Sequence, residues 1–481
     1  MTADEHHFRI PEVNRVFDRR RILFVILMFL VMVMVGMSSV NVALPSIEHG
    51  LGATDSDIQW ILSAYALAIG LGLVPAGRAG DVLGRDAFFV TGVVVFMTGA
   101  LFSGLAPTPA VLNVARIVQG LGSSLVAPQL TGMIVRYFEG RSRAMAFASM
   151  GVVASVAMAV GPTLSGAIIT AVGEQGWRVA FLINLPAGLL ALILAAMWFP
   201  FEKERGLWRH RRNGLPKVDL DPVGAVLLGA AVLSVMLPLI VKGVPAIWGL
   251  WVLSPVLGWL WVRWELAYRR RGRQPMVMME LFRVRSYSNQ VMVSAAMFMA
   301  NTPMFVVAAL YTQQAHGATA LVAGLIGLPN AVSQALAAWW AGRRAMMIGQ
   351  HLVVIGVLLN LVGAPLVIGC AVLVDSTGLH YGWLALPLVL PGLGMGLFSG
   401  TNLALAMRDV PLEMAGTAGG VKQLAERMTT SIGTALVTAV LFAVLVAGGW
   451  TWAFAAGFAT IAAIFVLGLW LAIRALRAAS G

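Results

Sequence analysis

The chain has 481 residues, of which 59% are hydrophobic and 11% are charged, and its mean hydropathy is +0.85. Soluble domains carry about 25% charged residues, so this composition excludes a water-soluble globular protein. The net charge of +12 does not indicate nucleic-acid binding, because the basic residues lie in the gaps between apolar segments and mark one face of a membrane. We therefore expect a lipid bilayer, and not nucleic acid, as a partner of this chain.

Fourteen apolar segments follow one another along the chain, each about long enough to cross a bilayer core of roughly 30 Å as a helix. The predicted spans are residues 22–44, 58–77, 87–107, 109–135, 145–171, 177–199, 221–241, 246–266, 288–312, 321–341, 347–372, 382–407, 414–443 and 450–473. This pattern predicts an all-α polytopic membrane protein. Most Lys and Arg residues lie in the even-numbered gaps and in both terminal tails, which the positive-inside rule places on the cytoplasmic side of the inner (cytoplasmic) cell membrane.

Two long basic stretches divide these spans into groups of six, two and six. The predicted plan is a cytoplasmic N-terminal tail (1–21), a six-helix bundle (22–200), a basic linker (201–220), two inserted helices (221–266), a second basic linker (267–287) and a C-terminal six-helix bundle (288–481). Repeated bundles with a substrate site at their interface are common in membrane transporters. The tail is polar and the first span is too long for a signal peptide, so we expect the tail to be retained.

Six short motifs occur in order along the first bundle: residues 41–45, 59–65, 77–85, 116–120, 161–166 and 177–186. Together they resemble the motifs of the major facilitator superfamily, in particular its fourteen-helix drug:proton antiporters, and the resemblance covers nearly the full length. It implies two six-helix bundles with two inserted central helices. It also implies a secondary active exporter of small amphipathic molecules that works by alternating access and proton antiport, with no catalytic residue and no cofactor. The single cysteine, Cys370, gives no metal site.

The basic turn after the second span resembles the superfamily's cytoplasmic loop motif. The resemblance implies a conformational latch formed by Gly77, Asp81, Gly84 and Arg85. An acid at a membrane boundary can face the partial positive charge of a helix N-terminus, and the resemblance implies that Asp81 docks on the start of the thirteenth span, near residues 413–416. A solvated turn is the alternative. Ala79 and Asp86 depart from the family pattern, which predicts a weaker latch.

Arg116 lies inside the predicted fourth span, where a buried guanidinium normally pairs with another group or faces a water-filled cavity. The resemblance implies that this arginine takes part in proton coupling, and a merely structural pair is the alternative. The fifth span carries the antiporter motif at Gly161, Pro162 and Gly166, in which Ser165 replaces a family glycine.

The family's usual acid in the first span is replaced by Gly36, so its first-helix proton site is absent. Glu426 is the one acid that we place near the midplane, about 16 Å inside the thirteenth span. Lys422 lies one turn earlier on the same helix face, and Arg427 adjoins the acid. Burial disfavours a charged carboxylate and a nearby cation favours it, so its protonation can respond to which partner is near. We expect Glu426, Arg116, Lys422 and Arg427 to serve proton coupling; a permanently paired Lys422 and Glu426 that only packs helices is the alternative.

The family arrangement implies a substrate cavity between the bundles. Its expected polar lining residues are Asn41, Tyr65, Gln129, Asn301, Asn330, Gln334, Asn402 and Gln423. Polar groups among many Met, Phe and Trp residues suit a small amphipathic or lipid-like substrate. The predicted spans hold three cations, Arg116, Lys422 and Arg427, and one acid near the midplane. This balance favours a neutral, zwitterionic or anionic substrate over a multiply cationic one. Nothing in the sequence specifies an oligomeric state.

Two other functions compete with drug export. An apolar cavity does not distinguish drugs from lipids, so an exporter or flippase of cell-envelope lipids or glycolipids is the first alternative. An intramembrane lipid-modifying enzyme is the second, but the sequence has no His-Glu-x-x-His motif. His49, His316 and His380 fall in predicted outer loops without an evident acid neighbour.

Overall fold

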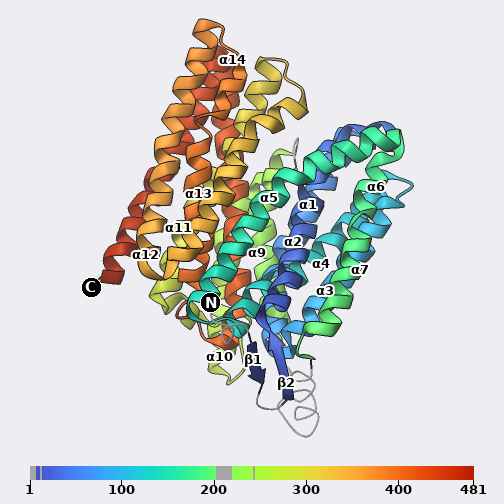
Figure 1. Cartoon of the computed structure of the whole chain (residues 1–481), viewed down its shortest axis with the longest axis vertical. Helices are drawn as coiled ribbons and strands as arrows, with labels where there is room; N and C mark the ends of the chain where they lie inside the picture. Colours follow the sequence, from blue (N-terminus) through green and yellow to red (C-terminus); the bar gives the residue numbers. More distant parts are fainter. Residues whose placement is uncertain (1–6, 11–12, 202–218, 242–243, 481) are drawn as a thin grey trace. The chain divides into compact units, whose positions relative to one another are not determined.

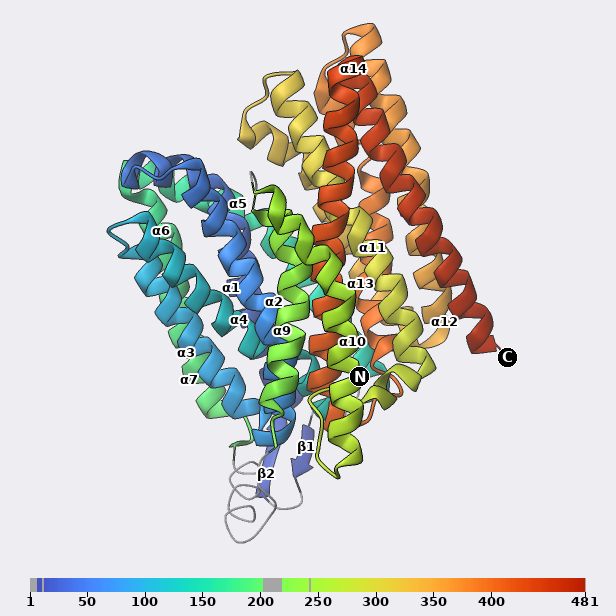
Figure 2. The same ribbon diagram turned by 180° about the vertical axis from the view of Figure 1, so that it is seen from behind.

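A computed structural model describes residues 7–10, 13–201, 219–241 and 244–480 (Figures 1 and 2). Most of the predicted basic linker, residues 202–218, lies outside the described residues, as do parts of the predicted N-terminal tail. The helices of the first half are α1 (Arg19–Leu51), α2 (Asp55–Leu83), α3 (Arg85–Gly104), α4 (Pro109–Tyr137), α5 (Gly140–Val172), α6 (Gly176–Leu182) and α7 (Asn184–Trp198). The later helices are α9 (Pro222–Ile240), α10 (Gly249–Arg270), α11 (Arg285–Leu310), α12 (Ala320–Thr377), α13 (Val389–Ala406) and α14 (Ala415–Ser480).

The described residues contain 13 helical segments long and apolar enough to cross a membrane. One of them, Leu412–Ala478, has 67 residues, several times the roughly 20 that a bilayer core requires. It is interrupted at Gly449, whose φ of 74° lies in the left-handed region that glycine adopts without a Cβ clash. Two spans therefore lie in this segment, and the predicted all-α polytopic fold with fourteen spans is confirmed.

Helix starts follow from the side chains that precede them. Thr54 accepts a hydrogen bond from the amide of Asp57, and the Asp57 side chain accepts one from the amide of Thr54, which forms a capping box at the start of α2. Thr108 accepts from the amide of Val111, and Pro109 occupies the first position of α4, where its missing N–H costs nothing. These caps satisfy amides that have no partner inside the helix.

A short hairpin in the N-terminal tail is not predicted by the sequence. Strands β1 (His7–Ile10) and β2 (Val13–Asp18) pair antiparallel, with His7 opposite Asp18. Asp18 then accepts a hydrogen bond from the amide of Arg20 at 2.8 Å and so caps α1.

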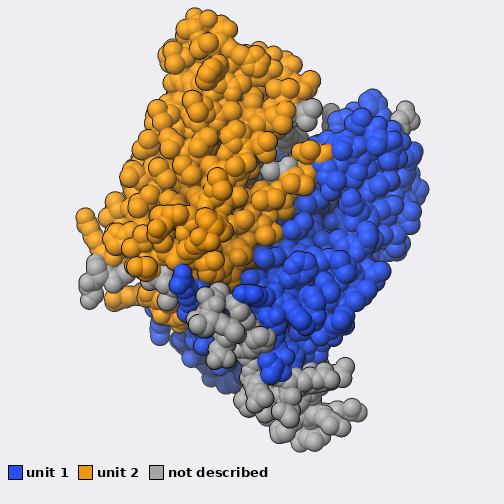
Figure 3. Space-filling view, in the orientation of Figure 1, with its two compact units in different colours: residues 1–142, 164–283, 410–424 blue, residues 143–163, 284–409, 425–481 orange. Residues whose placement is uncertain are grey.

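The chain divides into two compact units (Figure 3). Unit 1 contains residues 1–142, 164–283 and 410–424, and unit 2 contains residues 143–163, 284–409 and 425–481. Helices α5 and α14 therefore each contribute to both units. In unit 1, the Phe29 ring packs edge-to-face against Phe89 and Phe96, each 5.6 Å from it between ring centroids. The inserted helices α9 and α10 lie side by side in the same unit (Figure 2).

Candidate functional site

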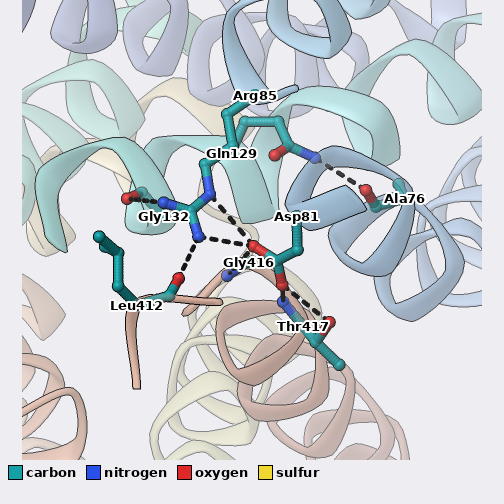
Figure 4. A network of polar contacts seen from close by, with 8 residues as sticks. All are labelled: Ala76, Asp81, Arg85, Gln129, Gly132, Leu412, Gly416 and Thr417. Carbon is teal, nitrogen blue, oxygen red and sulfur yellow. Dashed lines mark hydrogen bonds and ion pairs between the residues drawn. The ribbon is translucent and has the colours of Figure 1, made fainter. Parts of the chain in front are cut away.

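Asp81, in the last turn of α2, binds the first turn of α14 (Figure 4). One carboxylate oxygen accepts from the amide of Gly416 at 2.9 Å, and the other accepts from the amide and the hydroxyl of Thr417 at 2.7 and 2.9 Å. Gly416 and Thr417 are the second and third residues of α14, so their amides have no acceptor within the helix. Asp81 therefore caps a helix from outside it, with its negative charge at the positive end of the helix dipole.

Arg85 holds this carboxylate in place. Its Nε and Nη2 donate to the same Asp81 oxygen at 3.1 and 2.7 Å, and both side chains are almost completely buried. The guanidinium also donates to the carbonyl of Gly132 at 2.9 Å and to the carbonyl of Leu412 (Figure 4). Leu412 begins the short 3-10 turn Leu412–Met414 that leads directly into α14, so Arg85 and Asp81 both bind the start of this helix.

Close backbone contact brings α2 to this helix start. A Cβ added to Gly77 would lie 2.5 Å from the carbonyl oxygen of Gly416, too close for any side chain at that position. One turn later on α14, a Cβ on Gly420 would lie 2.5 Å from the carbonyl oxygen of Leu73. Gly84 has a φ of 120°, which favours glycine, and it ends α2 directly before α3. The predicted latch residues Gly77, Asp81, Gly84 and Arg85 thus lie in one place, and their role as a latch stays a prediction.

The two departures from the motif have different surroundings. Ala79 is buried with 9% of its surface exposed. Asp86 is fully buried, and its carboxylate accepts from the hydroxyl of Tyr137 at 3.0 and 3.1 Å. The carbonyl of Tyr137 in turn accepts from Arg19 at 2.7 Å. Asp86 therefore joins α3 to α4, a role that the sequence motif does not indicate.

Arg116 is 1% exposed and lies among neutral groups in α4. Its Nη1 donates to Gln119 at 2.6 Å and its Nε to the carbonyl of Ile61 at 3.2 Å. Its guanidinium lies 4.0 Å from the ring centroid of Tyr65, and the Tyr65 hydroxyl is 3.0 Å from Ser123 Oγ. Within the described ranges, none of these partners is a carboxylate. The cation is therefore stabilised by hydrogen-bond dipoles and by an aromatic face.

The predicted coupling residues on α14 lie on both sides of the division between the units. Lys422 is buried in the part of the helix that belongs to unit 1, and Glu426 and Arg427 begin the part that belongs to unit 2. The Glu426 carboxylate accepts a hydrogen bond from the hydroxyl of Ser294 in α11, a partner that the sequence does not predict. Since α14 starts at Ala415, Glu426 lies about three turns inside the helix.

The expected cavity residues differ in their surroundings. Gln129 and Gln423, both in unit 1, donate to the carbonyls of Ala76 at 2.8 Å and Ala127 at 3.3 Å. Asn330 and Asn402, both in unit 2, are buried and donate to the carbonyl of Leu388 at 2.8 Å and to Gln290 at 2.8 Å. Asn41 is exposed, and Asn301 and Gln334 are half-buried. The buried amides bind neighbouring helices in this structure, and the lining of a substrate cavity stays a prediction.

The antiporter motif lies where α5 passes from one unit to the other. Gly161 and Pro162 lie just before Thr163, where the part in unit 2 ends. Gly166 lies in the part in unit 1, where a Cβ on it would meet Val42 at an ordinary 3.8 Å. Within unit 2, α5 packs closely on α13, because a Cβ on Gly400 would lie 2.9 Å from the Cα of Ala148.

The expectation that His316 has no acid neighbour is wrong. Its Nε2 lies 3.2 Å from Asp375, which also accepts from the hydroxyls of Tyr311 at 2.7 Å and Thr451. These residues come from three separate segments of unit 2, so no spacing in the sequence indicates the cluster. His316 itself follows the π-helical turn Tyr311–Ala315.

Comparisons with known proteins agree with the helical architecture. The model of the Major Facilitator Superfamily matches residues 24–434. A probable actinorhodin transporter of Streptomyces coelicolor is 31% identical over 84% of this chain and 69% of its own length. The multidrug resistance protein Stp of Mycobacterium tuberculosis is 29% identical over 84% of this chain and 72% of its own.

A solved structure shares the fold. The human organic anion transporter MFSD10 has a TM-score of 0.68 and 15% identity, with 96% of this chain and all of that chain covered. Superfamily members are membrane transporters, which excludes the enzyme alternative. Because the family model spans most of the sequence and a curated relative exceeds 30% identity, this multi-pass membrane protein belongs to the Major Facilitator Superfamily.

Proposed function

We propose that the chain is a secondary active exporter of small amphipathic molecules, coupled to proton antiport by alternating access. The observation that carries this proposal is the position of Glu426, an ionisable group inside a segment apolar enough to span the membrane. Its partner Ser294 suits a group that gains and loses a proton, because a hydroxyl can donate to a carboxylate and can accept from a carboxylic acid. The names of the two relatives, a probable actinorhodin transporter and a multidrug resistance protein, support export as the direction.

The contact between Asp81 and α14 supplies the conformational part of the proposal. Alternating access requires contacts that exist in one state and break in another. The cap by Asp81 and Arg85 consists of charge-assisted hydrogen bonds to one helix end, so it can form or separate as a unit. Movement of α14 would displace Glu426 as well, because both sites lie on this helix.

The substrate class follows from the charges inside the spans. Arg116 has neutral partners and Lys422 is buried, so a multiply cationic substrate would be repelled, and a neutral, zwitterionic or anionic molecule is favoured. Export or flipping of a cell-envelope lipid or glycolipid is the second candidate, because an apolar substrate cavity would not distinguish drugs from lipids. We place the protein in the inner cell membrane with both termini cytoplasmic, from the distribution of Lys and Arg.

Transport in proteoliposomes tests this proposal. The purified full chain is reconstituted, a pH gradient is imposed, and the movement of dyes, antibiotics and envelope lipids is measured together with the internal pH. Substrate movement that needs the gradient and dissipates it supports proton antiport. Lipid movement without drug movement favours the second candidate, and drug movement unaffected by the gradient contradicts coupling.

A further inference from the structure

A pair of acids is buried between the inserted helices, away from the residues proposed to couple transport. Asp221 is fully buried directly before α9, and Glu265, in α10, is 1% exposed. A Cβ on Gly224 would lie 2.5 Å from Asp221 Oδ2 and 3.0 Å from Glu265 Oε1. Asp221 Oδ2 and Glu265 Oε1 therefore lie beside the same point next to Gly224. The distance between these two oxygens is at most the sum of the two distances to the added Cβ.

Three of the four carboxylate oxygens of the pair already accept N–H groups. Asp221 Oδ1 accepts from the amide of Gly224 and from the indole of Trp264, both at 2.9 Å. Glu265 Oε1 accepts from the indole of Trp261 at 2.8 Å, and its Oε2 from the amide of Val277 at 3.3 Å. Asp221 Oδ2 is buried and has no hydrogen-bond partner. A buried oxygen without a donor is costly, so this atom indicates a missing ligand.

The surrounding charges do not neutralise the pair. The titratable and charged groups that the neighbouring elements present are Arg78 of α2, Asp219 before α9, Arg263, Tyr268, Arg269 and Arg270 of α10, and Arg271 and Arg273 after it. Among the described residues, no cation forms an ion pair with Asp221 or Glu265. Arg271 lies 5.8 Å from the Trp264 ring, Arg273 lies 5.5 Å from the Tyr268 ring, and the Tyr268 hydroxyl donates to Asp219.

We infer that Asp221 and Glu265 share one proton and form a proton-binding site at the end of the inserted helix pair. Two neighbouring buried carboxylates do not both ionise, because their charges repel and burial penalises each of them. A proton on Asp221 Oδ2 can point toward Glu265 Oε1. Asp221 Oδ2, which has no hydrogen-bond partner, then becomes a donor to the neighbouring carboxylate. A divalent metal ion does not fit, because it requires several oxygen ligands and a single carboxylate oxygen is left.

The shared proton would connect three parts of unit 1: the residue before α9, the helix α10, and Val277 in the segment after it. Its loss would leave two negative charges in one buried space and weaken these contacts. The site would respond to pH on the side of the membrane where α9 begins and α10 ends. This inference does not depend on the proposed proton antiport, because it concerns different acids.

Infrared difference spectroscopy of the purified full chain in lipid tests the site. Spectra recorded between about pH 5 and pH 8, where coupled buried carboxyls titrate, should show a protonated-carboxyl C=O band that disappears as the pH rises. Both Asp221→Asn and Glu265→Gln should move the loss of this band to lower pH, because either change removes the like charge beside the remaining buried acid. Glu280→Gln, which alters a partly exposed acid paired with Arg269 in the following segment, should keep the band.

A thermal titration provides a second readout. The folded wild type would hold a proton that the unfolded chain releases, so its unfolding midpoint should fall as the pH rises through this range. Asp221→Asn keeps the shape and supplies an N–H toward Glu265, so its midpoint should depend less on pH. The absence of the band in the wild type, or its loss at an unchanged pH in both acid variants, would overturn the shared proton. The wild-type spectrum decides this even where a variant fails to fold.

Discussion

Asp81 and Thr417 are joined by two hydrogen bonds to one carboxylate oxygen, from the amide at 2.7 Å and from the hydroxyl at 2.9 Å. They are 336 positions apart in the chain, and the contact joins the end of one helix to the start of another. Thr417 thus provides two donors to an acid whose side chain is completely buried. Such charge-assisted hydrogen bonds are each worth about 1.5–3 kcal/mol.

Asp81→Asn should keep expression and lose most transport. The amide retains one acceptor, but its NH₂ group faces N–H donors of Arg85, Gly416 or Thr417, so at least one charge-assisted hydrogen bond is lost. A loss of about 1.4 kcal/mol lowers the ratio of docked to undocked molecules about tenfold. Transport in reconstituted vesicles measures the effect, and near-normal activity would contradict a latch.

Asp409→Asn is the matched control for this change. Burial raises the pKa of Asp409, but hydrogen bonds from Arg408 and Ser286 outweigh it and hold the pKa below its usual value. Asp409 is therefore also an ionised acid beside an arginine, but its side chain is half exposed. Transport by this variant should stay close to wild type.

Arg116→Lys should lose activity even though it keeps the charge. The guanidinium donates in two directions, to Gln119 and to the carbonyl of Ile61, and stacks on Tyr65. A lysine ammonium is compact and cannot keep this planar arrangement. Arg343→Lys, at an exposed arginine stacked 3.6 Å from the Trp339 ring centroid, is the control and should stay active. A fully active Arg116→Lys protein would show that charge alone suffices, and an active Arg116→Ala protein would remove this residue from the mechanism.

The sequence predicts the helices and the helix start that Asp81 binds. Apolar runs of about 20 residues locate spans because length and hydropathy are local properties. The resemblance of residues 77–85 to a known loop placed its acid near residues 413–416, and the structure has Asp81 at Gly416 and Thr417.

The remaining contacts depend on which helices are neighbours, and hydropathy does not encode this. Two of these contacts are Asp86 with Tyr137 and His316 with Asp375. In each contact the two residues are dozens of positions apart, and their local sequences share no motif. Asp221 and Glu265 lie at the ends of the predicted spans 221–241 and 246–266, which gives only their position along the chain. Their burial follows from packing between α9 and α10.

Gly77→Ala should destabilise the contact between α2 and α14, whereas Gly36→Ala should not. A Cβ at Gly77 would lie 2.5 Å from a backbone oxygen of Gly416, so the two helices must separate. Overpacking of this kind typically costs about 1–3 kcal/mol. A Cβ at Gly36 would meet Phe96 at 3.5 Å and Asn184 at 3.8 Å, which are ordinary contacts. Thermal unfolding of both variants measures the difference, and equal midpoints would show that the close approach at Gly77 is not needed.

Glu426→Gln should abolish transport driven by a pH gradient and preserve downhill exchange of substrate. Glutamine keeps the shape and can still accept the hydrogen bond from Ser294, but it cannot change its charge. Ser294→Ala tests whether the hydroxyl only positions the Glu426 carboxylate or is needed for carrying the proton, because it leaves the acid and removes the hydroxyl. This variant should keep gradient-driven transport with an altered pH dependence. Glu280→Gln, at a partly exposed acid, should change neither measurement. If the Glu426→Gln protein still moves substrate against its gradient with normal pH dependence, Glu426 is structural and another residue carries the proton.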